Sequence, residues 1–450
     1  MYWQYGMSKA EKQAERRLSM ALTQQLLSFL DPLLKQLDRC IDKRLIRTLL
    51  DTVIAILLFR DRAKHLLLSE LGAYIASPAH APAGTKRLSN LLRSLRWDGQ
   101  LIEHFLWQRA TADVEAMERQ GETPLVVWDE SMLEKPESLK LEGLGSVRSS
   151  KGKRLTHIKP GFYQPPKGTI FVPGMQWLCL VLVGLQTTPV LAAMQWWTNR
   201  GVFKSSRRCE EGWWLGRCMH AWGRRVVHVF DRGFAGAPWL EECMQYKLRF
   251  VMRWPKGFML RDFRWIKQKA WQITRGKRNQ WKRQLYNRHL NAWVQGGVVV
   301  VPVTHPAVRG QFWLVVSRPG KGQLPWYLLT NEPIQTEEDA WQVVFVYARR
   351  WQIEMTWRYT KSELGFESPR LWTWQARVKL LLIASLAFAF LLSLLALSFQ
   401  AVRDRLLRLW CHRTGERYRL VEIPLYRLRE ALSFLWLTFP PRIPLLHFSG

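Results

Sequence analysis

The sequence predicts a mixed α/β protein in which an all-α N-terminal domain precedes an α/β core with a β-rich insertion. Apolar residues recur at helical spacing up to about residue 120, short β-branched runs begin after Pro124, and helical stretches then alternate with those runs. Such alternation is typical of an α/β sheet. We therefore expect domains at 1–120 and 121–400, an insertion at about 240–330 and a C-terminal helical tail at 401–450.

The N-terminal prediction rests on periodicity. Leu22, Leu26 and Leu30 fall on one helical face, and a second stretch repeats the pattern around Val53. We expect the Pro-, Gly- and Ala-rich segment 77–84 to interrupt these helices, because such residues favour turns.

The core strands are predicted from short apolar, β-branched runs. The first group lies at 125–128, 177–185, 190–196 and 226–230, with a helix at about 210–224 before the last run. A second group lies at 250–253, 298–303, 312–316 and 326–330, and one helix is expected over about 337–364.

Residues 380–399 form a run of 20 residues without a charge, which is long enough to cross a membrane. The alternative is a helix buried in the core of a large α/β domain, and we favour it because the candidate chemistry lies directly upstream. The six cysteines show no CxxC pair or disulfide-like spacing, so a reducing, cytoplasmic setting is expected.

The charge balance indicates a polyanionic partner. The chain carries 67 Lys and Arg against 36 Asp and Glu, a formal net charge of +31. Nucleic acid and an anionic membrane surface both fit such an excess. The 48% content of hydrophobic residues excludes wholesale disorder.

Two aspartates follow predicted strands. Asp129 ends the run LVVWD, and Asp231 ends VVHVFD. Side chains at the carboxyl ends of strands in an open α/β sheet project into the crevice where ligands bind. Taken alone, an Asp after a strand is more commonly a turn former or a helix cap. Glu130 competes with Asp129, but alternation along a strand would point it to the other face.

The predicted helix over 337–364 carries a polar face. Tyr347, Arg350, Glu354 and Lys361 fall within roughly 60° of arc at about 100° per residue. Arg358 joins the same stripe. In isolation such a face is also typical of a solvated surface with intrahelical ion pairs.

These residue types together suit phosphodiester chemistry. Two metal ions about 3.5–4 Å apart can activate the attacking oxygen and stabilise the leaving one. Mg²⁺ takes oxygen ligands, so carboxylates from different elements suffice. Basic and phenolic groups beside them would hold the flanking phosphates.

The spacing of Tyr347, Arg350, Glu354 and Lys361 matches, in every residue and gap, the YREK motif of one branch of the DDE insertion-sequence transposases. The sequence Asp231-Arg232-Gly233-Phe234 resembles the second-aspartate motif of that branch, and the residues around Asp129 resemble the first. The resemblance covers roughly residues 120–400. It implies a ribonuclease-H-like fold in which Asp129, Asp231 and Glu354 are catalytic and hold two Mg²⁺, for which Mn²⁺ can substitute. It also implies that Tyr347, Arg350 and Lys361 contact DNA phosphates.

The spacing of the three carboxylates predicts the insertion. There are 122 residues between Asp231 and Glu354, more than one strand and a connection need. Within it, residues 253–288 carry twelve Lys or Arg and a single acid, interleaved with aromatic residues. Basic groups neutralise phosphates and aromatic faces stack unpaired bases, although the aromatics could equally fill a small β core. Besides the YREK residues, we expect DNA contacts from Arg232, Arg358, Lys267, Lys269, Arg275, Lys277, Arg278, Trp265 and Trp271.

The resemblance implies a DNA transposase that binds the terminal inverted repeats of its insertion sequence, cleaves DNA and transfers 3′-OH ends into target DNA. Joining two ends implies a homodimer on DNA, in a cytoplasmic, nucleoid-associated setting and without a membrane. The N-terminal domain, with basic residues such as Lys43 and Lys86, would recognise the ends, or serve only as a packing bundle. A catalytically silent, transposase-derived DNA-binding protein, a ribonuclease-H-like nuclease or resolvase, and an integral membrane protein remain alternatives.

Overall fold

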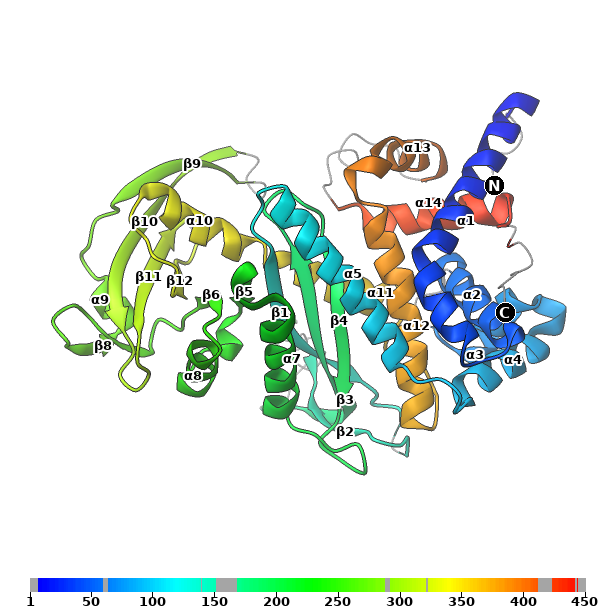
Figure 1. Ribbon diagram of the computed structural model, residues 1–450, viewed down its shortest axis with the longest axis horizontal. Helices are drawn as coiled ribbons and strands as arrows, with labels where there is room; N and C mark the ends of the chain where they lie inside the picture. The colour runs from blue at the N-terminus through cyan, green and yellow to red at the C-terminus, as the bar shows by residue number, and fades with distance from the viewer. Residues whose placement is uncertain are drawn as a thin grey trace, which may run out of the picture.

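The computed structural model describes residues 7–59, 64–138, 140–150, 168–287, 292–320, 323–411, 423–441 and 443. A second basic stretch, at 148–159, is also predicted from the sequence to contact DNA, and its part at 151–159 lies outside the described residues. Helices gather at one end of the molecule and a long sheet extends to the other (Figure 1).

The N-terminal region is helical. Its helices are α1 (Lys9–Asp38), α2 (Lys43–Leu58), α3 (Leu68–Ile75), α4 (Ala81–Arg93) and α5 (Gln100–Arg119). Ser8 caps α1 in a capping box with Glu11, and Asp42 caps α2 by accepting from two backbone N–H groups.

The expected interruption at 77–84 is shorter in the structure. A 3₁₀ turn spans Pro78–His80, and α4 begins at Ala81 and includes Gly84. Pro82 lies in the first turn of α4, where a missing N–H costs little. Gly84 packs against Gly72 of α3 so closely that a Cβ on Gly84 would lie 2.1 Å from the carbonyl oxygen of Gly72. Glycine here permits helix packing instead of ending the helix.

Five strands form the centre of a mixed sheet. They are β1 (Leu125–Glu134), β3 (Phe171–Val183), β4 (Val190–Trp197), β5 (Val227–Phe230) and β6 (Arg249–Arg253). Their order is β4–β3–β1–β5–β6, in which β4, β3 and β1 pair antiparallel and β1, β5 and β6 pair parallel. The short strand β2 (Gly145–Arg148) adds to the start of β3.

The β-rich insertion continues the same sheet. It contains β7 (Met259–Arg261), β8 (Lys267–Lys269), α9 (Ala270–Ile273), β9 (Trp281–Asn287), β10 (Ala292–Thr304), β11 (Gln311–Arg318) and β12 (Trp326–Thr330). Strand β12 pairs antiparallel with β6, and β11 and β10 follow outward. Within the described ranges, the twelve strands therefore form one sheet.

The two faces of the central strands are buried against different helices. One face, with Val126 and Trp128 of β1, joins a core with α5, α7 (Arg207–Trp222) and α8 (Ala237–Gln245). The other face, with Leu125 and Val127, joins a core with α10 (Glu337–Ala348), α11 (Trp351–Ser362) and α12 (Trp374–Ser393). Alternate side chains of β1 thus meet different helices.

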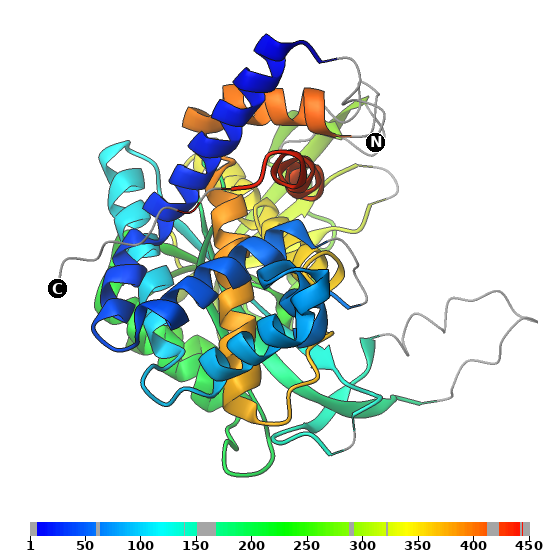
Figure 2. The ribbon, with the colours of Figure 1, turned by 90° about the vertical axis from the view of Figure 1, so that its right-hand side faces the viewer.

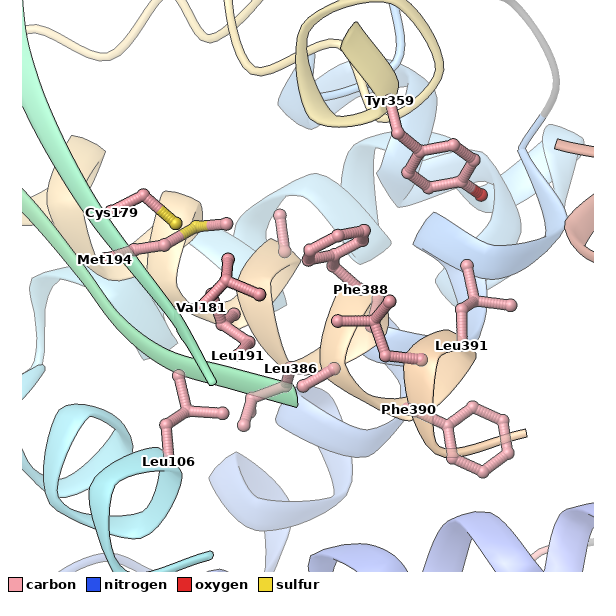
Figure 3. Close-up of a cluster of buried hydrophobic side chains, with 14 of the residues drawn as sticks. Leu106, Cys179, Val181, Leu191, Met194, Tyr359, Leu386, Phe388, Phe390 and Leu391 are labelled. Atoms are coloured by element: carbon pink, nitrogen blue, oxygen red, sulfur yellow. The ribbon is translucent and has the colours of Figure 1, made fainter. Parts of the chain in front are cut away.

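Helix α12 contains most of the uncharged run. Among the described residues it is the one helix with the length and hydropathy of a membrane span, and 89% of its most apolar stretch is buried. It packs against β4 on one side, and the N-terminal helices pack around it (Figure 2). Figure 3 shows Phe388 and Leu386 of α12 among Val181 of β3 and Leu191 of β4. The structure thus supports the interpretation of this run as a buried core helix.

The C-terminal helices α13 (Gln400–Trp410) and α14 (Leu425–Thr438) pack against the N-terminal region. Glu15 of α1, which is buried, accepts hydrogen bonds from Arg405 and from the indole of Trp410. In α14, Arg429 donates to the carbonyl oxygens of Phe59 and Glu363. The two ends of the chain therefore share one helical core.

Candidate active site

The two aspartates lie on neighbouring parallel strands. Residues Leu125–Trp128 of β1 pair with Val227–Phe230 of β5, and Asp129 and Asp231 each follow the last pair. Strand β1 does not end at Asp129 as the sequence analysis expected, because it continues to Glu134 paired with β3 alone. The pairing of β1 with β5 ends at Trp128 and Phe230, so both carboxylates lie at the carboxyl ends of the parallel strands.

Asp129 and Glu130 point to opposite faces, as alternation predicts. Asp129 accepts hydrogen bonds from the indole N–H of Trp357 (3.1 Å) and from the backbone N–H of Glu130 (2.8 Å). The Glu130 carboxylate turns to α7, where it pairs with Arg207 at 2.7 Å. Asp129, and not Glu130, therefore faces α11 and Glu354.

The single helix predicted over 337–364 is wrong, because the structure has two helices there. Helix α10 ends at Ala348 and α11 begins at Trp351. The backbone N–H of Arg350 donates to the carbonyl of Tyr347, three residues earlier, at 3.0 Å. Such bonds tighten the backbone at a helix end. The guanidinium of Arg349 donates to the carbonyl of Thr187 (2.7 Å), which holds the junction against the loop after β3.

Arg350 links the carboxylates. Its guanidinium forms an ion pair with Glu354 and lies 3.8 Å from Oδ2 of Asp129. The Tyr347 hydroxyl donates to Oδ1 of Asp231 at 3.2 Å. The structure therefore brings Asp129, Asp231, Glu354, Tyr347 and Arg350 together, despite the break between the two helices.

The electrostatics of the site reflect burial and opposed charges. Burial raises the pKa of Asp129 to about 6, Arg350 acts to lower it, and Asp231 adds to the rise. Burial acts to lower the pKa of Arg350, but Tyr347, Asp231 and Glu354 raise it above its usual value. Arg350 thus remains a cation among carboxylates.

The other basic residues of this region take different positions. The ammonium of Lys361 donates to Oγ of Ser131 and to the carbonyl of Met132, each at 2.6 Å, which fastens α11 to β1. Arg232, which follows Asp231 in sequence, and Arg358, one turn after Glu354 on α11, are exposed.

The DNA contacts predicted for the insertion lie on elements at its outer end, around β8 and α9 (Figure 1). Lys267 and Lys269 are the first and last residues of β8, Trp271 lies in α9, and Arg275, Lys277 and Arg278 follow α9. Trp265 is 69% exposed and has a φ of 61°, which is rare for a residue with a side chain. Asp262 holds this turn by accepting from the N–H groups of Arg264 and Ile266.

The aromatic residues of the insertion divide between core and surface. Trp254 is 2% exposed and belongs to the core, whereas Phe263 is 65% exposed. The guanidinium of Arg275 lies over the ring of Trp271, at 5.9 Å from its centroid. The core interpretation therefore holds for Trp254, and stacking of the exposed rings on bases stays a prediction.

The donor set suits a hard divalent cation only in part. Within the described part of the chain, no group of three or more His, Cys, Asp or Glu side chains is gathered closely enough to hold a metal ion. Asp129 and Asp231 lie near enough to interact electrostatically, and their oxygens are of the kind that Mg²⁺ prefers. Glu354 is engaged by Arg350, so its carboxylate would join them only after releasing that guanidinium.

Sequence reasoning missed Trp357. Its signal is weak, since a Trp three residues after Glu354 reads as an ordinary core residue. Only the tertiary structure shows that its N–H meets Asp129.

Comparison with known proteins supports one class of protein. Residues 215–390 match the family model described as the transposase DDE domain, a range that includes Asp231, Glu354 and Lys361. This match supports a DDE transposase. No curated protein matches the chain. Among solved structures, the chain is similar to a piggyBac transposase synaptic complex with hairpin DNA, at 14% identity and a TM-score of 0.40, over 90% of this chain and 74% of the other.

Proposed function

We propose that this protein is a DNA transposase of the YREK branch, which binds the terminal inverted repeats of its insertion sequence, cleaves DNA strands and transfers the 3′-OH ends into target DNA. One observation carries the proposal. Asp129 and Asp231 lie side by side at the edge of the parallel strands, and Arg350 joins Asp129 to Glu354 on α11. The order of these carboxylates and the matched region support the same class.

A ribonuclease-H-like core is part of this proposal. The central strands support it, because three antiparallel strands are followed by two parallel ones with helices on both faces. The carboxylates then lie at the carboxyl ends of the parallel strands, where open α/β sheets bind their ligands.

Asp129, Asp231 and Glu354 are the residues that would hold two Mg²⁺ or Mn²⁺ ions. When bound, such ions activate the attacking oxygen and stabilise the leaving one. The protein contributes positioning. Tyr347 orients Asp231, and Arg350, once released from Glu354, would bind the phosphate beside the cut. Pre-organised charge of this kind accounts for most of the catalysis in phosphoryl transfer.

DNA would run from the carboxylates along the insertion, where Lys267, Lys269 and the exposed Trp265 would contact its backbone and unpaired bases. We propose a homodimer on DNA, because two ends must be joined, and a cytoplasmic, nucleoid-associated location.

The experiment compares two neighbouring substitutions in a cleavage assay. The substrate is DNA that spans the borders of the reading frame with its inverted repeats, and the cation is Mg²⁺. Asp129→Asn should abolish cleavage and leave DNA binding intact, whereas Glu130→Gln should still cut, because Glu130 faces α7. If Asp129→Asn cuts as the wild type does, Asp129 is not in the site.

A further inference from the structure

Three tryptophans form a cluster beneath the carboxylates. Trp177 of β3 stacks on Trp196 of β4 at 5.7 Å between ring centroids, and Trp357 of α11 meets Trp177 edge-on at 4.3 Å. Phe366 stacks on the same Trp177 ring at 5.2 Å. All four rings are buried. Trp357 therefore has little freedom to change its rotamer.

The three indole N–H groups differ in their partners. Those of Trp177 and Trp196 are buried with no hydrogen-bond partner in the described structure. The N–H of Trp357 donates to Oδ2 of Asp129 at 3.1 Å. A donor held rigidly at this oxygen stabilises one orientation of the charged form.

The bond also leaves Asp129 able to bind a cation. Oδ1 accepts the N–H of Glu130 and Oδ2 accepts that of Trp357. Each carboxylate oxygen has two lone-pair sites, so one remains on each. Without the indole, the carboxylate would keep the hydrogen bond from the Glu130 N–H and the weaker attraction of Arg350, 3.8 Å from Oδ2.

We propose that Trp357 is a positioning residue that fixes the carboxylate of Asp129 in its cation-binding orientation and couples it to α11. Trp357 and Glu354 lie three residues apart on that helix, so one rigid element places Glu354 and orients Asp129 together. The inference rests on the proposed function in that it takes Asp129 as a cation ligand.

The test compares Trp357→Phe with Trp196→Phe. Both changes replace a buried indole of one cluster by a smaller ring, but only the first removes a hydrogen bond to Asp129. Mn²⁺ binding is measured by electron paramagnetic resonance and by thermal shift. We expect the Mn²⁺ dissociation constant to rise about tenfold in Trp357→Phe and to stay unchanged in Trp196→Phe.

DNA cleavage gives the second measurement. Trp357→Phe should lower kcat and leave KM for DNA unchanged, because the indole N–H contacts Asp129 rather than the DNA-facing arginines. If Trp357→Phe does not fold, benzothienylalanine at position 357 keeps a bicyclic ring and lacks the N–H, and the same two shifts are expected.

Equal Mn²⁺ affinity in Trp357→Phe and Trp196→Phe would overturn the positioning role and leave Trp357 as packing only. This outcome is distinct from failure of the proposed function. If the wild type binds Mn²⁺ and cuts no DNA, the transposase proposal fails, while the difference in Mn²⁺ affinity still decides the role of Trp357.

Discussion

Replacing Arg350 by Met should strengthen cation binding even though it removes a residue of the site. The guanidinium lies 3.8 Å from Oδ2 of Asp129 and is paired with Glu354, so it competes with any cation for both carboxylates. Met keeps the apolar stem of the side chain and removes the charge.

The expected change in Mn²⁺ affinity follows from the distance between Arg350 and Asp129 and from the solvent exposure of Glu354. Opposite unit charges 4 Å apart attract by about 4 kcal/mol at an effective dielectric constant of 20. Water that solvates the released guanidinium offsets much of this. The Glu354 side chain is 57% exposed, so its pairing adds only about 0–1 kcal/mol. We take a net effect of about 1.4 kcal/mol, which corresponds to a tenfold lower dissociation constant for Mn²⁺.

Mn²⁺ titration followed by thermal shift and paramagnetic resonance measures this effect. Arg358→Met is the control, because Arg358 is an exposed arginine of α11 that follows Glu354 by one helical turn. Mn²⁺ affinity should stay the same in this variant. DNA cleavage by Arg350→Met should still fall, because the phosphate loses its guanidinium. Mn²⁺ affinity in Arg350→Met equal to or weaker than that of the wild type would refute the competition.

Three further outcomes are expected. Gly84→Ala should lower the free energy of unfolding by about 1–3 kcal/mol, because its Cβ would overlap the backbone of α3, whereas Gly216→Ala in α7 has room and should raise it by about 0.5–1 kcal/mol; urea denaturation measures both. Burial lowers the pKa of His65 to about 3 from 6.5, so the unfolded chain takes up its proton first as the pH falls. His65 should therefore contribute a loss of about 2 kcal/mol of stability between pH 7.5 and 5, and His65→Asn should remove this contribution from the pH profile. Lys267→Gln with Lys269→Gln should reduce the slope of log K for DNA against log salt by about 2, and an unchanged slope would exclude phosphate contact there.

The elements that the sequence predicted well are those set by local pattern. Periodicity located the N-terminal helices, and β-branched runs located the central strands, although β1 ends six residues later and β3 begins six residues earlier than predicted. Alternation along β1 predicted that Asp129 and Glu130 face different helices. These features depend on residues that are close in sequence, so the periodicity of the sequence predicts them.

The remaining features depend on tertiary contacts. The break between α10 and α11 contains no Gly or Pro, and it accompanies contacts of Arg349 and Arg350 with distant segments. The pairing of β12 with β6, which joins the insertion to the core sheet, has no local signature either.

The hydrogen-bond partners of individual side chains could not be predicted from the sequence either. Lys361 was expected to face DNA, and the structure shows its ammonium bonded to Ser131 and Met132 of β1. Its role in DNA binding stays a prediction.

The decisive measurement is strand transfer by the purified protein. DNA that carries both borders of the reading frame is incubated with a target plasmid and Mg²⁺, and the products are sequenced at the junctions. We expect cuts at the inverted repeats and 3′ ends joined to the plasmid in the wild type, and neither in Asp231→Asn. Cutting that persists in Asp231→Asn, or a wild type that binds the borders and never cuts them, would contradict the assignment of this site to DNA transposition.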